Sequence, residues 1–170
     1  GSSEMEIKAV FVDAGGTLLR TREPVGICYA RTARRFGIHV DPVQVGQRFK
    51  AALKAQNQRQ RGDGRSYWRP VVAKALDRPE AECVEVFEAL YDWYAWPSAW
   101  WVDTEALKLC STLARKGIRL GIISNWDRRL RLLYNRFALD RMFPFLICSA
   151  EHGLEKPDPM IFQIACRVAG

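Results

Sequence analysis

Three polar segments follow apolar runs of the sequence and carry the side chains best suited to phosphate chemistry. The first is Asp13, the second is Ser124 with Asn125, and the third is the loop Glu155-Lys156-Pro157-Asp158. A carboxylate can attack phosphorus directly, a hydroxyl can donate a hydrogen bond to a phosphoryl oxygen, and an ammonium group can neutralise the negative charge. If the fold brings these segments together, they predict phosphoryl transfer.

The loop after Asp13 consists of small residues, Ala-Gly-Gly-Thr at 14–17. Two consecutive glycines let the backbone approach an anion or a metal ion closely. An aspartate in this setting can also do no more than cap a turn. The fold around the loop must decide between these two interpretations.

Each polar segment ends an apolar run that predicts a buried parallel strand, at 7–13, 118–125 and 143–149. Amphipathic helices are predicted at 103–117, 128–139 and 159–170. Alternating strands and helices are typical of a parallel α/β sheet with right-handed connections. Ligands bind outside the carboxyl ends of such strands, so we expect Asp13, Ser124 and Lys156 at one edge.

The chain between the first strand and about Trp100 has helical periodicity only. Helices are predicted at 26–38, 43–58 and 80–96, and a loop rich in glycine and arginine is predicted at 59–70. A helical insert therefore interrupts the α/β core directly after its first strand.

The 170 residues suffice for one well-buried core with a modest insert. The net charge of +7 comes from basic residues scattered over amphipathic segments, which indicates a solvated basic surface rather than a nucleic-acid site. A small phosphorylated partner, which is negatively charged, is compatible with this positively charged surface. Without an apolar run of membrane-spanning length or a signal peptide, we expect a soluble, cytoplasmic protein that does not bind membranes.

The five cysteines are spread along the chain among apolar neighbours, which favours reduced, buried thiols over disulfides. With only His39 and His152, a histidine-based zinc site is not expected. The opening Gly1-Ser2-Ser3 is typical of a cloning remnant, with Met5 the natural start. Residues 1–5 are therefore set aside from the fold.

The segments "VFVDAGGTLL", "LGIISNWD" and "SAEHGLEKPDPMIF" stand in this order, with the insert after the first. They resemble motifs one to three of the haloacid dehalogenase-like hydrolase superfamily, in the subgroup of domain-containing proteins with a C1-type cap. The resemblance implies an α/β fold with a Rossmann-like parallel sheet. It places the core at residues 6–21 and 101–170 and the helical cap at 22–100.

The resemblance also implies roles for individual residues. Asp13 matches the catalytic nucleophile that forms an aspartyl-phosphate and binds magnesium, and Lys156 matches the catalytic motif-three lysine. Ser124, with Asn125 beside it, matches the residue that contacts the phosphoryl group.

The remaining matches lie in the loop after Asp13. Gly16 and Thr17 belong to the implied substrate-binding loop, and Thr17 matches the threonine that supports it. The backbone carbonyl of Gly15 matches a second ligand of the Mg²⁺ cofactor.

Two departures from the family pattern weaken the implied activity. Where phosphatases of the family carry a second aspartate, which acts as general acid and base, this chain has Gly15; such help is worth about 10²- to 10⁴-fold in rate. A fourth motif with further acidic metal ligands, in later C-terminal strands, is also missing. We expect a shortened form of a longer protein, whose first strand has an open edge through which it could self-associate.

The sequence thus favours a magnesium-dependent phosphatase of low activity, acting on a small phosphorylated metabolite. The alternative is an inactive member that works by binding a ligand or a protein. The sequence does not separate phosphatase from dehalogenase chemistry, although the Gly-Gly-Thr loop favours phosphate.

Several side chains keep two interpretations. Ser124 and Asn125 could serve only as a helix N-cap, and Asp127 could cap the next helix or replace the missing acid. The aromatic segment 91–101 could pack the junction of cap and core or form a binding platform. Four arginines of the insert could contact a second anionic group of the substrate or be solvated: Arg59, Arg61, Arg65 and Arg69.

Overall fold

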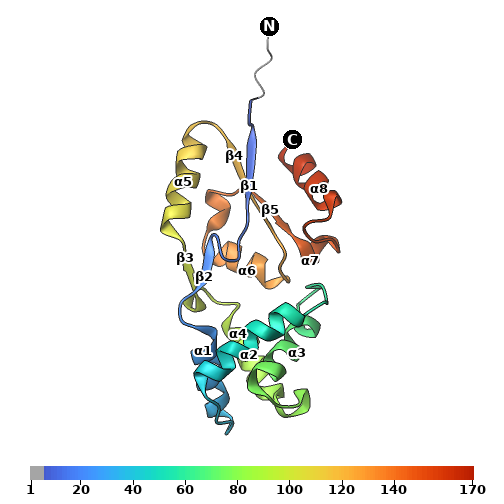
Figure 1. Cartoon of the computed structure of the whole chain (residues 1–170). Coiled ribbons are helices and arrows are strands. Elements are labelled where there is room, and N and C mark those ends of the chain that lie inside the picture. The colour runs from blue at the N-terminus through green and yellow to red at the C-terminus, as the bar shows by residue number, and fades with distance from the viewer. Residues whose placement is uncertain (1–5) are drawn as a thin grey trace.

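The core of the protein is a three-stranded parallel sheet in the order β1-β4-β5, seen in a computed structural model that describes residues 6–170 (Figure 1). The strands are β1 (Ala9–Val12), β4 (Arg119–Ser124) and β5 (Phe145–Cys148). The predicted cloning remnant at residues 1–5 lies outside the described residues. In the register, Val12 is paired with Ile122 and Ser124 with Cys148, so the polar segments leave the sheet at one edge.

Helices cover both faces of this sheet. They are α5 (Thr104–Arg115), α6 (Arg129–Arg136), the short α7 (Ser149–His152) and α8 (Pro159–Ala169), with a 3₁₀ turn at Leu139–Arg141. Leu120 and Ile122 of β4 pack in one cluster with residues of α5 and α6, whereas Ile123 packs with Ile161 and Ala165 of α8. This alternation confirms the predicted α/β core, because successive side chains of a strand face opposite sides.

β1 is an edge strand, with β4 as its strand neighbour in the described sheet. Val10 and Val12 pack with the α5 and α6 cluster, and Phe11 packs on the α8 side. All four residues of β1 are only partly buried. No helix in the described part of the chain is long and apolar enough to span a bilayer.

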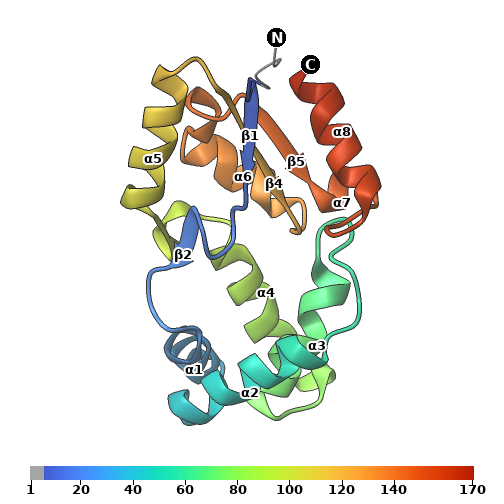
Figure 2. The same cartoon turned by 45° about the horizontal axis from the view of Figure 1, so that its top comes forward.

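The insert folds into a separate helical layer below the carboxyl edge of the sheet (Figure 2). Its helices are α1 (Val25–Arg35), α2 (Pro42–Ala55), α3 (Arg65–Leu76) and α4 (Val84–Trp93), with 3₁₀ turns at Glu80–Glu82 and Pro97–Ala99. They enclose their own hydrophobic cluster, which includes Tyr29, Val45, Leu76 and Phe87. This layer, residues 22–100, is called the cap below.

The loop predicted at 59–70 is wrong in its second half, because α3 already begins at Arg65. The Asp63 side chain accepts a hydrogen bond from the Arg65 N–H, which satisfies one of the free donors at the start of the helix. Pro70 lies inside α3, although proline disfavours the interior of a helix. The packing of α3 against α2 overrides this local preference.

A small ribbon that the periodicity did not predict connects cap and core. β2 (Leu19–Thr21) and β3 (Trp100–Val102) pair in antiparallel fashion, with Arg20 opposite Trp101. Strands of three residues are too short to give a periodic signal. The ribbon brings the two points at which the chain passes between core and cap side by side.

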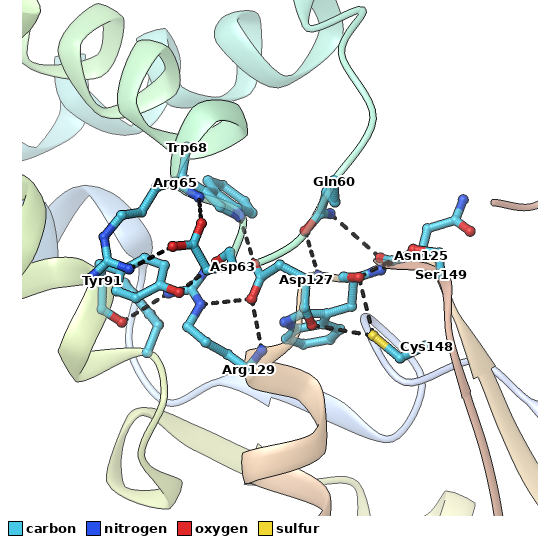
Figure 3. A network of polar contacts seen from close by, with 12 residues as sticks. Gln60, Asp63, Arg65, Trp68, Tyr91, Asn125, Asp127, Arg129, Cys148 and Ser149 are labelled. Atoms are coloured by element: carbon cyan, nitrogen blue, oxygen red, sulfur yellow. Dashed lines mark hydrogen bonds and ion pairs between the residues drawn. The ribbon is translucent and has the colours of Figure 1, made fainter. Parts of the chain in front are cut away.

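A buried ion pair fixes the cap on the core (Figure 3). Asp127 has no exposed surface, and its two carboxylate oxygens lie 2.9 Å from Nε and Nη2 of Arg129. Asp127 also accepts a hydrogen bond from the indole N–H of Trp68 in the cap, at 3.2 Å. The pair is thus shared by a core loop and a cap helix.

Further hydrogen bonds link the same loop to the cap. Gln60 accepts from the Asp127 N–H at 3.1 Å and donates to the carbonyl of Asn125 at 3.5 Å. The Arg128 N–H donates to the carbonyl of Gly62, and Arg129 Nη1 donates to the carbonyl of Tyr91, each at 2.9 Å. Loop 125–129 is therefore held to the cap by backbone and side-chain contacts together.

The crossing of α1 and α2 predicts opposite effects for two glycines. A Cβ atom at Gly26 would lie 2.2 Å from the carbonyl oxygen of Pro42, whereas one at Gly46 would meet nothing closer than 3.9 Å. Gly26→Ala should lower the free energy of unfolding by about 1–3 kcal/mol, as overpacking does. Gly46→Ala should raise it by about 0.5–1 kcal/mol, because alanine favours the helix. Urea unfolding of both variants measures this, and equal effects would contradict the close crossing.

The buried ion pair predicts a large stability effect for one of two arginines. Arg129→Met leaves the Asp127 carboxylate buried without its cation, so the free energy of unfolding should fall by about 3–5 kcal/mol. The control is Arg131→Met, which removes an exposed pair with Glu151 and should cost less than about 1 kcal/mol. Adding Asp127→Asn to Arg129→Met should restore part of the loss. A small effect of Arg129→Met in urea unfolding would show that the pair does not hold the cap.

Candidate functional site

The structure brings Asp13, Ser124 and Lys156 together at the carboxyl edge of the sheet. The hydroxyl of Ser124 donates to Oδ1 of Asp13 at 2.8 Å, and Nζ of Lys156 lies 3.2 Å from Oδ2. Ser124 is buried, whereas 45% of the Asp13 side chain is exposed. The carboxylate is thus oriented through both oxygens and still open to a reactant.

Asn125 lies beside this group and holds the backbone of Lys156. Its Nδ2 donates to the Lys156 carbonyl at 3.0 Å, and its Oδ1 accepts from the Lys156 N–H at 2.7 Å. Both ends of the amide are therefore engaged by the third polar segment. In this arrangement, Asn125 positions the lysine, a role that the sequence reasoning missed.

The loop after Asp13 is a tight turn around the carbonyl of Ala14. This oxygen accepts from the N–H groups of Thr17, Leu18 and Leu19. The N–H of Gly16 donates to the carbonyl of Leu19 at 3.0 Å, and Gly16 adopts a positive φ of 75°. Gly16 and Thr17 are exposed beside the site, where their predicted contact with substrate stays a prediction.

Gly15, where phosphatases of the resembled family have an acid, is in contact with Trp126. A Cβ atom at this position would lie 3.3 Å from the indole ring, which is closer than ordinary packing. The backbone N–H of Trp126 donates to the Ser149 hydroxyl at 3.0 Å, and the Trp100 ring packs beside the Trp126 ring at 5.2 Å between centroids. Trp126 therefore lies against the space that a side chain at residue 15 would enter.

Cys148, at the end of β5, anchors the same loop. Its sulfur lies 3.2 Å and 3.3 Å from the carbonyl oxygens of Trp126 and Asp127. Burial raises the pKa of this thiol to about 12, so it is a neutral donor at physiological pH. The buried cysteines are free thiols, as predicted, although the free thiol of Cys166 is exposed.

The donors for a magnesium ion are few but of the right type. Among residues 6–170 there is no cluster of three or more acidic, histidine or cysteine side chains. The Gly15 carbonyl, two residues after Asp13 in the sequence, accepts no hydrogen bond from residues 6–170. It is therefore available as a ligand. Mg²⁺ binds through one or two carboxylates and completes its shell with water and substrate phosphate. The residues present therefore fit part of a magnesium site.

Asp127 takes the structural role that the sequence left open for it. Its Oδ1 accepts the N–H of Arg129 at 3.0 Å, in the first turn of α6, and its charge is paired in full burial. Both carboxylate oxygens of Asp127 are thus already engaged as hydrogen-bond acceptors. The geometry therefore favours helix capping over replacement of the missing acid.

The arginines of the insert serve different purposes. Arg65 forms ion pairs with Asp63 and Glu88, at 2.8 Å and 3.0 Å. Arg59 lies 3.9 Å from Glu155, and Arg69 lies over the ring of Phe87. Arg59, Arg61 and Arg69 are exposed, in agreement with the solvated interpretation, whereas Arg65 is engaged by two carboxylates.

A cavity of about 240 Å³ opens between cap and core next to the site. Gly15 and Asn125 line it on the core side, two residues after Asp13 and one after Ser124. From segment 91–101, Tyr91, Tyr94 and Trp100 line it as well, whereas Trp96 and Trp101 are exposed at the surface. The aromatic segment therefore divides between the cavity wall and the surface.

The contacts that assemble this region were not predictable one by one. Gln60, Trp68 and Arg129 belong to helices or loops without a motif, and they reach the site through the placement of the cap. The only sequence signal was the string "SNWD", whose Asn, Trp and Asp each fix a different neighbour.

Comparisons with known proteins agree with this architecture. The family model described as haloacid dehalogenase-like hydrolase matches residues 7–170. The chain is 35% identical over 179 residues to the human haloacid dehalogenase-like hydrolase domain-containing protein 3, covering 97% of this chain and 70% of the human one.

Two solved structures share the fold. L-2-haloacid dehalogenase from Xanthobacter autotrophicus, with chloropropionic acid covalently bound, matches with a TM-score of 0.67 at 21% identity over 96% of this chain and 65% of that one. HAD phosphatase from Thermococcus onnurineus matches with a TM-score of 0.60 at 22% identity over 96% and 72%. The family model and the 35% identity to the human protein show that the chain belongs to the haloacid dehalogenase-like hydrolase family.

Proposed function

We propose that this hydrolase cleaves a phosphate monoester of a small molecule through a covalent intermediate on Asp13. The observation that carries the proposal is the half-exposed Asp13 carboxylate between a hydroxyl and an ammonium group, Ser124 at 2.8 Å and Lys156 at 3.2 Å. This arrangement combines an accessible nucleophile with donors for a phosphoryl oxygen.

In the first step, an Asp13 carboxylate oxygen forms a bond to phosphorus while the bond from phosphorus to the leaving oxygen breaks. Ser124 donates to a phosphoryl oxygen, and Lys156, held by Asn125, offsets the charge that gathers there. In the second step, water attacks the aspartyl-phosphate and releases inorganic phosphate and the free carboxylate. Because residue 15 is glycine and has no acid to donate a proton, the leaving oxygen departs as an alkoxide or phenolate and takes its proton from solvent water.

Magnesium fits this mechanism as a cofactor held by the Asp13 carboxylate and the Gly15 carbonyl. When bound, the ion would neutralise phosphoryl charge as a Lewis acid. The chain itself provides the nucleophile, the hydroxyl and the ammonium group, and the cation would add to the charge already supplied by Lys156.

The contact of Gly15 with Trp126 favours a second candidate from another class. A family member without the general acid can bind a phosphorylated ligand through Ser124 and Lys156 and release it unchanged. Such a protein would retain affinity for inorganic phosphate while turning over no monoester, so binding and turnover measured together separate the two candidates.

A carbon substrate is a further alternative for the same nucleophile. The dehalogenase from Xanthobacter autotrophicus holds chloropropionic acid covalently, and a halide leaves without a proton, so Gly15 would cost that reaction little. The hydroxyl and ammonium donors around Asp13 favour phosphate. Chloride release from 2-chloropropionate, in place of phosphate release from a monoester, would reverse this choice.

Substitutions at the predicted nucleophile and lysine test the proposal. With 4-nitrophenyl phosphate and Mg²⁺, Asp13→Asn should reduce hydrolysis to the background rate, because an amide oxygen is a poor nucleophile. Lys156→Gln should lower kcat by about 10²- to 10³-fold, as the loss of one charge-stabilising donor does. The control is Lys108→Gln, an exposed lysine of α5 that should leave the rate unchanged. Full activity of Asp13→Asn would refute the covalent mechanism.

Restoring an acid at residue 15 should require space beside it. Gly15→Asp alone should gain little activity toward an alkyl phosphate, because the new side chain meets the Trp126 ring. Gly15→Asp combined with Trp126→Ala should exceed Trp126→Ala alone by about 10²-fold or more, the lower end of general acid catalysis. Phosphate release from 2-phenylethyl phosphate measures this. Equal rates in the double and single variants would show that more than the acid is missing.

A further inference from the structure

The cavity between cap and core has an apolar lining. Half of the residues that line it are aromatic, and most of the others are aliphatic or small. Phe49 and Trp68 stack with their ring planes only 8° apart, and Trp100 and Trp126 close the core side at 5.2 Å between centroids. The cavity beside Asp13 is therefore suited to a hydrophobic group, because transfer of apolar surface from water into an apolar cavity is favourable.

Most polar side chains in the lining are already engaged by the protein, although the buried Tyr94 hydroxyl has no hydrogen-bond partner among the described residues. Gln60 is bonded to loop 125–129, Asn125 holds Lys156, and Arg129 is paired with Asp127. Burial raises the pKa of Tyr29 and of Tyr94, so both remain neutral phenols. A hydroxyl-rich ligand would lose its bonds to water in this cavity and find few replacements, which is costly for each unmet group.

The size of the cavity limits what it can hold. Its volume of about 240 Å³ exceeds the roughly 150 Å³ of an engineered apolar cavity that takes up benzene. It remains below the usual range for drug-sized ligands, about 300–1,000 Å³. One ring with a short linker matches this volume.

We propose that the leaving group of the substrate is an apolar, ring-sized group that occupies this cavity while the phosphoryl group lies at Asp13. The inference rests on the proposed function, since it takes Asp13 as the point of phosphoryl transfer. It assigns the substrate to the phosphate monoesters of hydrophobic alcohols or phenols and excludes sugar and polyol phosphates.

The test compares two phosphates whose leaving groups are both alkyl alcohols, so that intrinsic reactivity does not decide the result. The value of kcat/KM for 2-phenylethyl phosphate should exceed that for glycerol 3-phosphate by at least about 10- to 200-fold, the range for apolar pocket contacts. Acetyl phosphate serves as a small reporter of the Asp13 chemistry. Equal or higher kcat/KM with glycerol 3-phosphate would overturn the assignment.

A pair of matched variants ties the preference to the cavity. Val25 begins α1 and lines the cavity, whereas Val84 begins α4 and is 59% exposed outside it. Val25→Phe should lower kcat/KM for 2-phenylethyl phosphate by about 10-fold or more and spare acetyl phosphate. Val84→Phe should change neither. If Val25→Phe lowered kcat/KM equally for 2-phenylethyl phosphate and acetyl phosphate, the placement of the substrate's ring in this cavity would be refuted.

A ligand-binding measurement tests the assignment of the cavity even if the proposed hydrolysis does not occur. If acetyl phosphate and both alkyl phosphates remain uncleaved, the proposed hydrolysis is wrong. The cavity is then judged with 2-phenylethylphosphonate, whose binding is followed by the fluorescence of Trp68, Trp100 and Trp126. Binding weakened by Val25→Phe but not by Val84→Phe would support the apolar assignment, and binding insensitive to both would overturn it.

Discussion

The burial of the Asp127 charge is the constraint on which the arrangement of cap, cavity and site depends. A carboxylate removed from water is stable only when a cation and hydrogen-bond donors replace the solvent. Asp127 obtains these from both parts of the protein, Arg129 in the core and Trp68 in the cap. The cap therefore cannot move away from loop 125–129 without exposing or orphaning a charge, and the cavity is defined by this attachment.

The same loop connects the attachment to the chemistry. Asn125 holds Lys156, Trp126 lies against Gly15, and Asp127 holds the cap, so three consecutive residues serve three purposes. Their backbone is fixed in turn by Ser149 and Cys148 at the end of β5. A change in the position of the cap thus reaches Lys156 through a chain of short contacts.

The parallel core could be predicted because its signals are local. Buried strands and amphipathic helices show in their periodicity, and the polar residues at the strand ends follow from the geometry of parallel sheets. The meeting of Asp13, Ser124 and Lys156 was predictable for that reason. The start of α3, the β2-β3 ribbon and the role of Asn125 were not, because each depends on packing between segments far apart in the chain. The glycine- and arginine-rich composition of 59–70 was misleading, and the three-residue strands gave no periodic signal.

The absence of an acid at residue 15 and the apolar cavity form a consistent pair. A side chain at residue 15 would crowd the Trp126 ring, since its Cβ would lie 3.3 Å from the indole. An acidic side chain would also add a charged group to a lining that consists mostly of aromatic and aliphatic side chains. Glycine lets the indole approach the loop and keeps that wall apolar, at the cost of the proton donor. In the proposed mechanism, water for the second step would reach Asp13 through its exposed side rather than through the cavity, so that a hydrophobic leaving group and a hydrolytic step could share one carboxylate.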